Sequence, residues 1–149
     1  MKLSKKLISV IFIGIISLIF ISGLIGIYSQ NIDITSQNTE TNVVATGSME
    51  PTLYRGDIVI VEKNPDKVNV GDIVVYNAVW FDQPVLHRVI AIKKSSDGDV
   101  MYETKGDNNP VSDPYLVKRN QIISKVKMGK NGLAIIPKIG YITLRIRGL

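Results

Sequence analysis

Residues 55–61 read RGDIVIV, and residues 70–76 read VGDIVVY, so the run Gly-Asp-Ile-Val occurs twice at a short interval. Each copy places a turn-forming Gly-Asp pair directly before a short β-branched segment. This pattern is typical of a strand that begins immediately after a tight turn. Two copies mark two similar strand entries and do not make a repeat protein.

The segments around this pair have the same character. Residues 85–93 and 100–104 are rich in Val, Ile and Thr and flank Ser-Ser-Asp-Gly-Asp at 95–99, which suits a hairpin connection. Residues 121–128 form one more candidate strand. Between residues 43 and 128 the apolar positions show no sustained 3.6-residue period. The sequence therefore predicts a mostly β domain.

A long apolar segment precedes this domain. Residues 7–28 contain twenty-two positions without a charge, and as a helix they would span roughly 33 Å, which matches a hydrocarbon core of about 30 Å. Lys2, Lys5 and Lys6 come before it. By the positive-inside rule we expect a cytoplasmic N-terminus at residues 1–6 and a transmembrane anchor at 7–28, with the rest of the chain across the membrane.

A cleaved signal peptide is the alternative for this segment. Its apolar region would be roughly 7–15 residues long and would end at a small-x-small site, whereas residues 22–26 (SGLIG) offer no clean site of that kind. Residues 29–42 are polar and predict a stalk, and residues 43–149 predict an extracytoplasmic β-rich domain. The apolar but interrupted stretch 133–149 could pack on the β core or lie along the membrane surface.

Composition excludes several kinds of chemistry. The chain has no cysteine and one histidine, so we expect no disulfide, no thiolate nucleophile, no histidine-based metal site and no cofactor. Beyond the anchor, fifteen Lys and Arg stand against thirteen Asp and Glu, a balance that argues against nucleic acid as a partner. From Lys118 onward there are eight Lys and Arg and no acidic residue. This stretch could be a solvated face or a surface for anionic lipid.

One serine is a candidate nucleophile. Ser48 lies in TGSMEPT at residues 46–52, about twenty residues beyond the apolar segment, and a serine needs a neighbouring base to take its proton. His87 is the only histidine available for that role. Period-two alternation places His87 and Val89 on one face of the predicted strand, with Leu86 and Arg88 on the other.

An acid that orients the histidine would complete a catalytic triad. Residues 105–114 read KGDNNPVSDP and offer Asp107 and Asp113. Either one could instead be a turn-forming residue, the ordinary role of Asp beside Gly or Pro. The residues themselves leave this choice open.

Three motifs in this chain resemble those of type I signal peptidase, and they occur in the same order. They are Gly-Ser-Met-Glu-Pro-Thr, His-Arg-Val, and Lys-Gly-Asp-Asn-Asn, the last with a second Asp six positions after its own Asp. The resemblance is to the branch found in archaea, the endoplasmic reticulum and some Gram-positive bacteria. Residues 132–143 resemble the conserved tail of the family. The bacterial branch has a lysine base where this chain has His87, so the resemblance implies a Ser-His-Asp mechanism here.

Carried over by position, the resemblance implies roles for five residues. Ser48 would be the nucleophile, His87 the general base, and Asp113 the third catalytic residue. Asp107 would support the site or substitute as the acid. The oxyanion hole would use the Ser48 N–H and the Thr46 hydroxyl, although Thr46 could also be a simple turn residue.

The resemblance implies a signal-peptidase-like β catalytic domain that follows one N-terminal transmembrane helix. The expected function is a membrane-anchored serine endopeptidase that removes signal peptides after small residues. Its partners would be secretory preproteins, the lipid bilayer and the protein export machinery. It would lie in the cell membrane with its catalytic domain outside, or in the endoplasmic reticulum membrane of a eukaryote.

Two alternatives remain open. One is a different membrane-tethered serine protease, such as a self-cleaving regulator of the related repressor-type fold, against which His87 and the anchor argue. The other is an inactive membrane-anchored β module that binds an exported protein, against which the intact Ser48, His87 and Asp113 argue.

Overall fold

The computed structural model describes residues 5–31, 38–129 and 132–148, and the chain divides into two units, Met1–Asp33 and Ile34–Leu149. The first unit is the helix α1, Lys5–Asn31. Its described side chains at residues 10–22 are all exposed. Within the described part of the chain, no helix combines the length and the hydropathy that crossing a membrane requires. The anchor expected at residues 7–28 stays a prediction.

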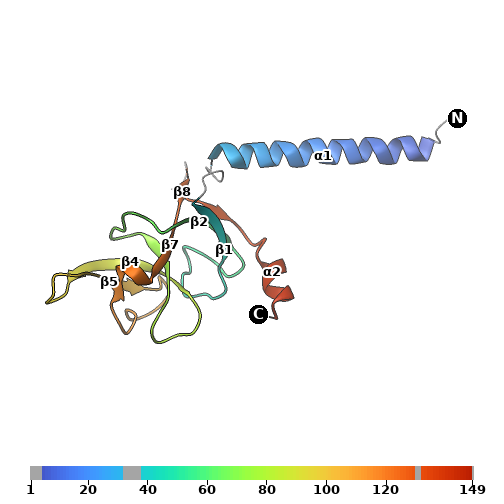
Figure 1. Cartoon of the computed structure of the whole chain (residues 1–149). Helices are drawn as coiled ribbons and strands as arrows, with labels where there is room; N and C mark the ends of the chain where they lie inside the picture. Colours follow the sequence, from blue (N-terminus) through green and yellow to red (C-terminus); the bar gives the residue numbers. More distant parts are fainter. Residues whose placement is uncertain (1–4, 32–37, 130–131, 149) are drawn as a thin grey trace. The chain divides into compact units, whose positions relative to one another are not determined.

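The second unit is mostly β, as the sequence predicts (Figure 1). Its described elements are β1 Thr39–Val43, β2 Ile58–Lys63, β3 Ile73–Tyr76, β4 Val85–Lys94, β5 Val100–Lys105, β6 Val117–Lys118, η1 Arg119–Gln121, β7 Ile122–Val126, β8 Met128–Gly129, β9 Gly132–Leu133, β10 Ile135–Ile136 and α2 Tyr141–Ile146.

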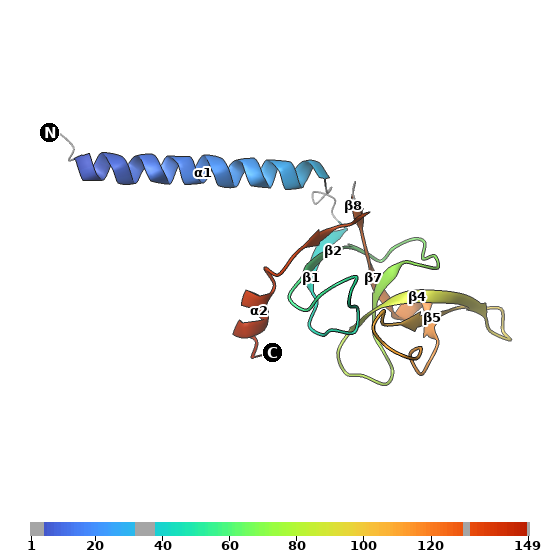
Figure 2. The same ribbon diagram turned by 180° about the vertical axis from the view of Figure 1, so that it is seen from behind.

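Eight of these strands form one antiparallel sheet. Seven follow the order β1-β2-β7-β3-β4-β5-β6, and the eighth, β10, pairs with Ile58 and Val59 at the start of β2. β4 and β5 form a long hairpin that extends away from the rest of the sheet (Figures 1 and 2). β4 pairs with β3 so that His87 lies opposite Val74. Pairing with β5 begins only at Arg88, opposite Lys105. The part of β4 before Arg88, which includes His87, therefore has no partner residue in β5, and the loop that follows β5 can approach it there.

The strand boundaries differ from expectation in two places. The last expected strand, 121–128, divides into β7 and the first residue of β8 after the short turn η1. β1 begins at Thr39, inside the polar segment expected as a stalk. Its Glu40 and Thr41 are exposed, because β1 is the terminal strand of the sheet and pairs only with β2. An edge strand does not need the apolar alternation used to recognise strands, so the polar composition hid it.

Apolar side chains pack into two clusters. One cluster contains Val68, Val74, Tyr76, Val85, Val89, Tyr102, Val117 and Ile122. The other contains Val44, Met49, Leu53, Val59, Val61, Ile73 and Val126. Neighbouring residues of β3 divide between the clusters, with Ile73 in one and Val74 in the other. This alternation lets a single curved sheet bury apolar side chains on both faces.

The C-terminal stretch packs on the β core, which is the first of the two placements that the sequence leaves open. Ala134 and Leu144 are buried, and β10 extends the sheet beside β2. Gly56 is required at this contact, because its φ is +85° and an added Cβ would lie 2.4 Å from the ring of Tyr141. The last turn of the chain is thereby held beside the cleft described below.

Candidate active site

Ser48 lies in the loop that connects β1 and β2. The two apolar residues that follow in this loop, Met49 and Leu53, are 1% and 0% exposed, and the Leu53 N–H donates to the Met49 carbonyl at 2.9 Å. These buried side chains fix the loop to the core. Ser48 itself is half-buried and lines a cleft.

His87 comes from β4 and lies on the same face as Val85 and Val89, as alternation predicts. Its Nε2 is 3.1 Å from Ser48 Oγ. Its Nδ1 is 2.9 Å and 2.8 Å from the two carboxylate oxygens of Asp113. The side chains of His87 and Asp113 are only 6% and 4% exposed, so water competes little for either contact.

Asp113 is held by three further hydrogen bonds. The Tyr76 hydroxyl donates to Oδ2 at 2.8 Å, and Thr104 Oγ1 donates to the same oxygen at 2.7 Å. The Asp113 N–H donates to the Thr104 carbonyl at 2.8 Å. Burial raises the pKa of the Asp113 carboxyl, but the hydrogen bonds from His87, Thr104 and Tyr76 outweigh it and leave the pKa below its usual range.

An ionised Asp113 assigns the protons along the chain of groups. A carboxylate can only accept, so His87 Nδ1 carries the hydrogen and donates it. Nε2 of the neutral ring is then an acceptor, and Ser48 Oγ–H donates to it. Thr46 Oγ1 lies 3.1 Å from Ser48 Oγ, and because the Ser48 hydrogen is directed to His87, the Thr46 hydroxyl donates to Ser48.

Asp107 does not contact His87 and instead forms an ion pair with Arg88. Arg88 Nε donates to Oδ1 at 2.8 Å and an Arg88 terminal nitrogen donates to Oδ2 at 2.7 Å. The Thr52 hydroxyl donates to Oδ2 at 2.5 Å, and the other terminal nitrogen of Arg88 donates to the Gly71 carbonyl at 2.8 Å. The hydrogen bonds from Arg88 lower the pKa of Asp107 and raise that of Arg88. Of the expected site residues, Ser48, His87, Asp113 and Thr46 come together, and Asp107 does not.

The loop after β5 also holds the backbone of Ser48. The Asn108 N–H donates to the Ser48 carbonyl at 2.8 Å, and Asn108 Nδ2 donates to the Gly47 carbonyl at 3.2 Å. Gly106 lies so close that an added Cβ would be 2.6 Å from the Ser48 carbonyl oxygen. Asp107 and its neighbours therefore fix the main chain of the serine loop.

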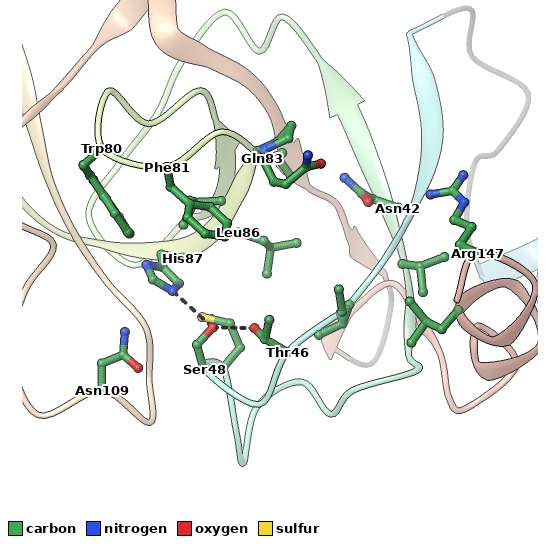
Figure 3. A pocket seen from close by; sticks show the side chains of 18 residues that line it. Asn42, Thr46, Ser48, Trp80, Phe81, Gln83, Leu86, His87, Asn109 and Arg147 are labelled. Carbon is green, nitrogen blue, oxygen red and sulfur yellow. Dashed lines mark hydrogen bonds between the residues drawn. The ribbon is translucent and has the colours of Figure 1, made fainter. Parts of the chain in front are cut away.

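A cleft of about 620 Å³ opens beside Ser48. Figure 3 shows Ser48 between His87 and Thr46, with Trp80 and Phe81 near His87 and Arg147 at the opposite end. The lining residues are Asn42, Val43, Val44, Ala45, Thr46, Ser48, Met49, Val75, Trp80, Phe81, Gln83, Pro84, Val85, Leu86, His87, Asn109, Leu144 and Arg147. The walls are mainly apolar, with polar groups near the serine and at the far end.

The described residues contain no group of three or more His, Cys, Asp or Glu that could hold a metal ion. Sequence reasoning did not single out Thr104, Tyr76, Arg88, Thr52 or Asn108. Thr104 carried a usable signal, because alternation along β5 places it with buried Tyr102, and a buried hydroxyl needs a partner. The others depend on contacts between residues distant in sequence.

Comparison with known proteins gives a consistent result. Residues 5–128 match the family model described as signal peptidase, peptidase S26. The chain is 38% identical over 115 residues to the signal peptidase complex catalytic subunit SEC11 of Scheffersomyces stipitis, covering 76% of this chain and 69% of that protein. It is 33% identical over 126 residues to the human subunit SEC11C, covering 83% of this chain and 66% of the human protein.

Proposed function

The chain belongs to the signal peptidase family, peptidase S26, and we propose that it is a serine endopeptidase that removes signal peptides from exported preproteins. One observation carries the proposal. Ser48 Oγ, His87 and Asp113 form a continuous hydrogen-bonded chain whose serine and histidine line the cleft, with the aspartate behind them. This is the arrangement that makes a serine hydroxyl nucleophilic.

Acylation follows from these contacts. Ser48 Oγ attacks the scissile carbonyl carbon while its proton passes to His87 Nε2 across the 3.1 Å contact. The ring becomes positively charged and is stabilised by the ionised Asp113. When the tetrahedral intermediate collapses, the C–N bond breaks and Nε2 donates its proton to the leaving amine, which is the new N-terminus of the mature protein.

The oxyanion would be stabilised by the Ser48 N–H and the Thr46 hydroxyl. Thr46 is 3.1 Å from Ser48 Oγ, and its hydroxyl can rotate from that oxygen to the carbonyl oxygen as negative charge develops. Such a donor is typically worth about 2.7–4 kcal/mol of barrier. Water then attacks the acyl-enzyme, gives a proton to His87, and releases the signal peptide as a carboxylate while Ser48 regains its hydrogen.

The substrate would bind as an extended strand in the cleft. Residues 42–46 line the cleft and include the last two residues of β1, which is the terminal strand of its sheet, so main-chain hydrogen bonds could hold the substrate there. Beside Ser48 the cleft is bounded by Met49 and Leu86. In this proposal Met49 and Leu86 border the position next to the cut and would limit it to small residues.

A position at the membrane completes the proposal. In this proposal residues 1–6 are cytoplasmic, residues 7–28 are the anchor, and the polar residues after it form a short stalk. The apolar composition of residues 7–28 and the exposed side chains of α1 at residues 10–22 support it. The substrate's cleavage site leaves the same bilayer, so anchoring would confine the search to two dimensions. Lipid, preproteins and the export machinery are the proposed partners, in the cell membrane or, in a eukaryote, the endoplasmic reticulum membrane.

The test is cleavage of a preprotein by membranes that carry single variants. Ser48→Ala, His87→Ala and His87→Lys should each lose about 10⁴-fold or more in rate. Asp113→Ala should cost more than Asp107→Ala, because only Asp113 contacts the histidine. Ser112→Ala is the matched control, since its hydroxyl bonds Glu103 rather than the site. Wild-type activity in Ser48→Ala or His87→Ala would refute the mechanism, and the reverse order of the aspartates would exchange their roles.

A further inference from the structure

Thr104 touches Asp113 at two points. Its hydroxyl donates to Asp113 Oδ2 at 2.7 Å, and its carbonyl accepts from the Asp113 N–H at 2.8 Å. Thr104 is 0% exposed and is the last but one residue of β5, where the strand pairs with β4. Both the side chain and the main chain of Asp113 are thus hydrogen-bonded to the same residue of β5.

Tyr76 of β3 provides a second hydrogen-bond donor to the Asp113 carboxylate. Its hydroxyl donates to the same Oδ2 at 2.8 Å and lies 3.3 Å from Thr104 Oγ1. Tyr76 is itself 1% exposed, on β3. Burial raises the pKa of its hydroxyl, so it remains a neutral donor.

Without these donors the carboxylate would have a choice of orientations. A carboxylate next to one imidazole can rotate about its terminal torsion, which has a broad energy well. Two hydroxyls from different strands converge on Oδ2 and determine which edge of the carboxylate faces His87. They also satisfy a buried charge that would otherwise be costly.

We propose that Thr104, assisted by Tyr76, is a positioning residue that fixes the Asp113 carboxylate, and through it the ring of His87, in line with Ser48. This rests on the proposed function, because it assigns Thr104 a role in the same reaction. Thr104 touches neither substrate nor reacting atoms and acts only through Asp113.

The test uses variants of the full chain that differ by single groups. Thr104→Val keeps the shape and the backbone carbonyl but removes the hydroxyl, whereas Thr104→Ser keeps the hydroxyl. We expect Thr104→Val to lower kcat roughly 10- to 100-fold, the factor for one hydrogen bond to a charged group, with KM nearly unchanged. Thr104→Ser should restore most of kcat. Tyr76→Phe should cost less, since Thr104 remains, and Tyr102→Phe, on the same face of β5, is the tyrosine control.

A second readout does not need substrate. His87 is the only histidine, so its ring gives one set of imidazole signals in a nuclear magnetic resonance spectrum. The Nδ1–H signal should broaden or shift in Thr104→Val and recover in Thr104→Ser. If Thr104→Val does not fold, Tyr76→Phe and the double variant Thr104→Ser/Tyr76→Phe take its place in both measurements, with an intermediate loss expected.

The outcomes separate the two proposals. If the wild-type chain cleaves no better than Ser48→Ala, the proposed function fails, and the His87 signals still decide whether Thr104 positions the ring. If the wild-type chain cleaves and Thr104→Val has wild-type kcat, the positioning proposal is overturned. Equal losses in Thr104→Val and Thr104→Ser, or His87 signals that are unchanged in Thr104→Val, would overturn it as well.

Discussion

Gly106→Ala should impair catalysis while leaving the fold largely intact. Gly106 is buried, and an added Cβ would lie 2.6 Å from the Ser48 carbonyl oxygen and 2.8 Å from Asn109 Nδ2. Ordinary van der Waals contact begins at 3.4 Å, so the Ser48 main chain would have to move by about 0.8 Å. A displacement near 1 Å at a catalytic group can cost on the order of 100-fold in rate. We therefore expect a loss of about 30- to 100-fold.

The assay is cleavage of a preprotein in detergent or membranes, combined with thermal unfolding of the same preparations. Gly47→Ala is the matched control, because it is next to Ser48 yet its added Cβ would meet only the flexible Glu50 side chain at 3.1 Å. Gly47→Ala should stay within a few-fold of wild type. Overpacking should cost Gly106→Ala about 1–3 kcal/mol of stability, which is too little to account for the lost rate if the protein remains folded.

A double variant identifies the contact that matters. Gly106→Ala/Asn109→Ala removes the side-chain clash and leaves the clash with the Ser48 carbonyl. If the backbone contact is responsible, activity stays low in the double variant. Recovery of activity in that variant, or wild-type activity in a folded Gly106→Ala protein, would refute the reasoning.

Three further outcomes follow from the same contacts. Asp107→Asn should destabilise the fold at neutral pH, and in urea titrations the difference should narrow as pH falls below the unfolded Asp pKa of about 3.9. The sign follows because hydrogen bonds from Arg88 depress the pKa of Asp107. Leu144→Ala should cost about 2–5 kcal/mol in chemical unfolding, since Leu144 is 3% exposed. Trp80 is the only tryptophan and lines the cleft, so a signal-peptide substrate added to Ser48→Ala should change its fluorescence; an unchanged spectrum at saturating peptide would contradict the proposed binding mode.

The sequence predicts β3, β4 and β5 well, because β3 is buried throughout and β4 and β5 alternate buried residues with more exposed ones. β3 and the β4–β5 hairpin lie where β-branched runs and turn residues place them. It fails at β1, whose polar residues are tolerated at the terminal position of the sheet. It also fails for α2, a six-residue helix that depends on packing of Leu144 rather than on an amphipathic pattern. Local patterns report burial, and these two elements are defined by neighbours far away in sequence.

The site divides in the same way. Ser48 and His87 could be singled out because the chain offers one histidine and few serines on glycine-flanked turns. The two aspartates could not be distinguished from spacing, because both lie in one turn-rich segment. Which aspartate contacts His87 and which contacts Arg88 depends on the register of β4 with β5, and no pattern in a single sequence specifies that register.

That register explains why Asp107 and Asp113 are not interchangeable. His87 and Arg88 are consecutive in β4 and must face opposite sides of the sheet. Arg88 of β4 pairs with Lys105 of β5. Asp107, two residues after Lys105, therefore lies on the Arg88 face of the sheet, where it accepts hydrogen bonds from Arg88. Six more residues let the loop reach Asp113 on the His87 face. Moving Asp107 to His87 would require it to leave a bidentate contact with Arg88 and cross the strand. Asp107 should therefore give no compensation when Asp113 is replaced by Asn.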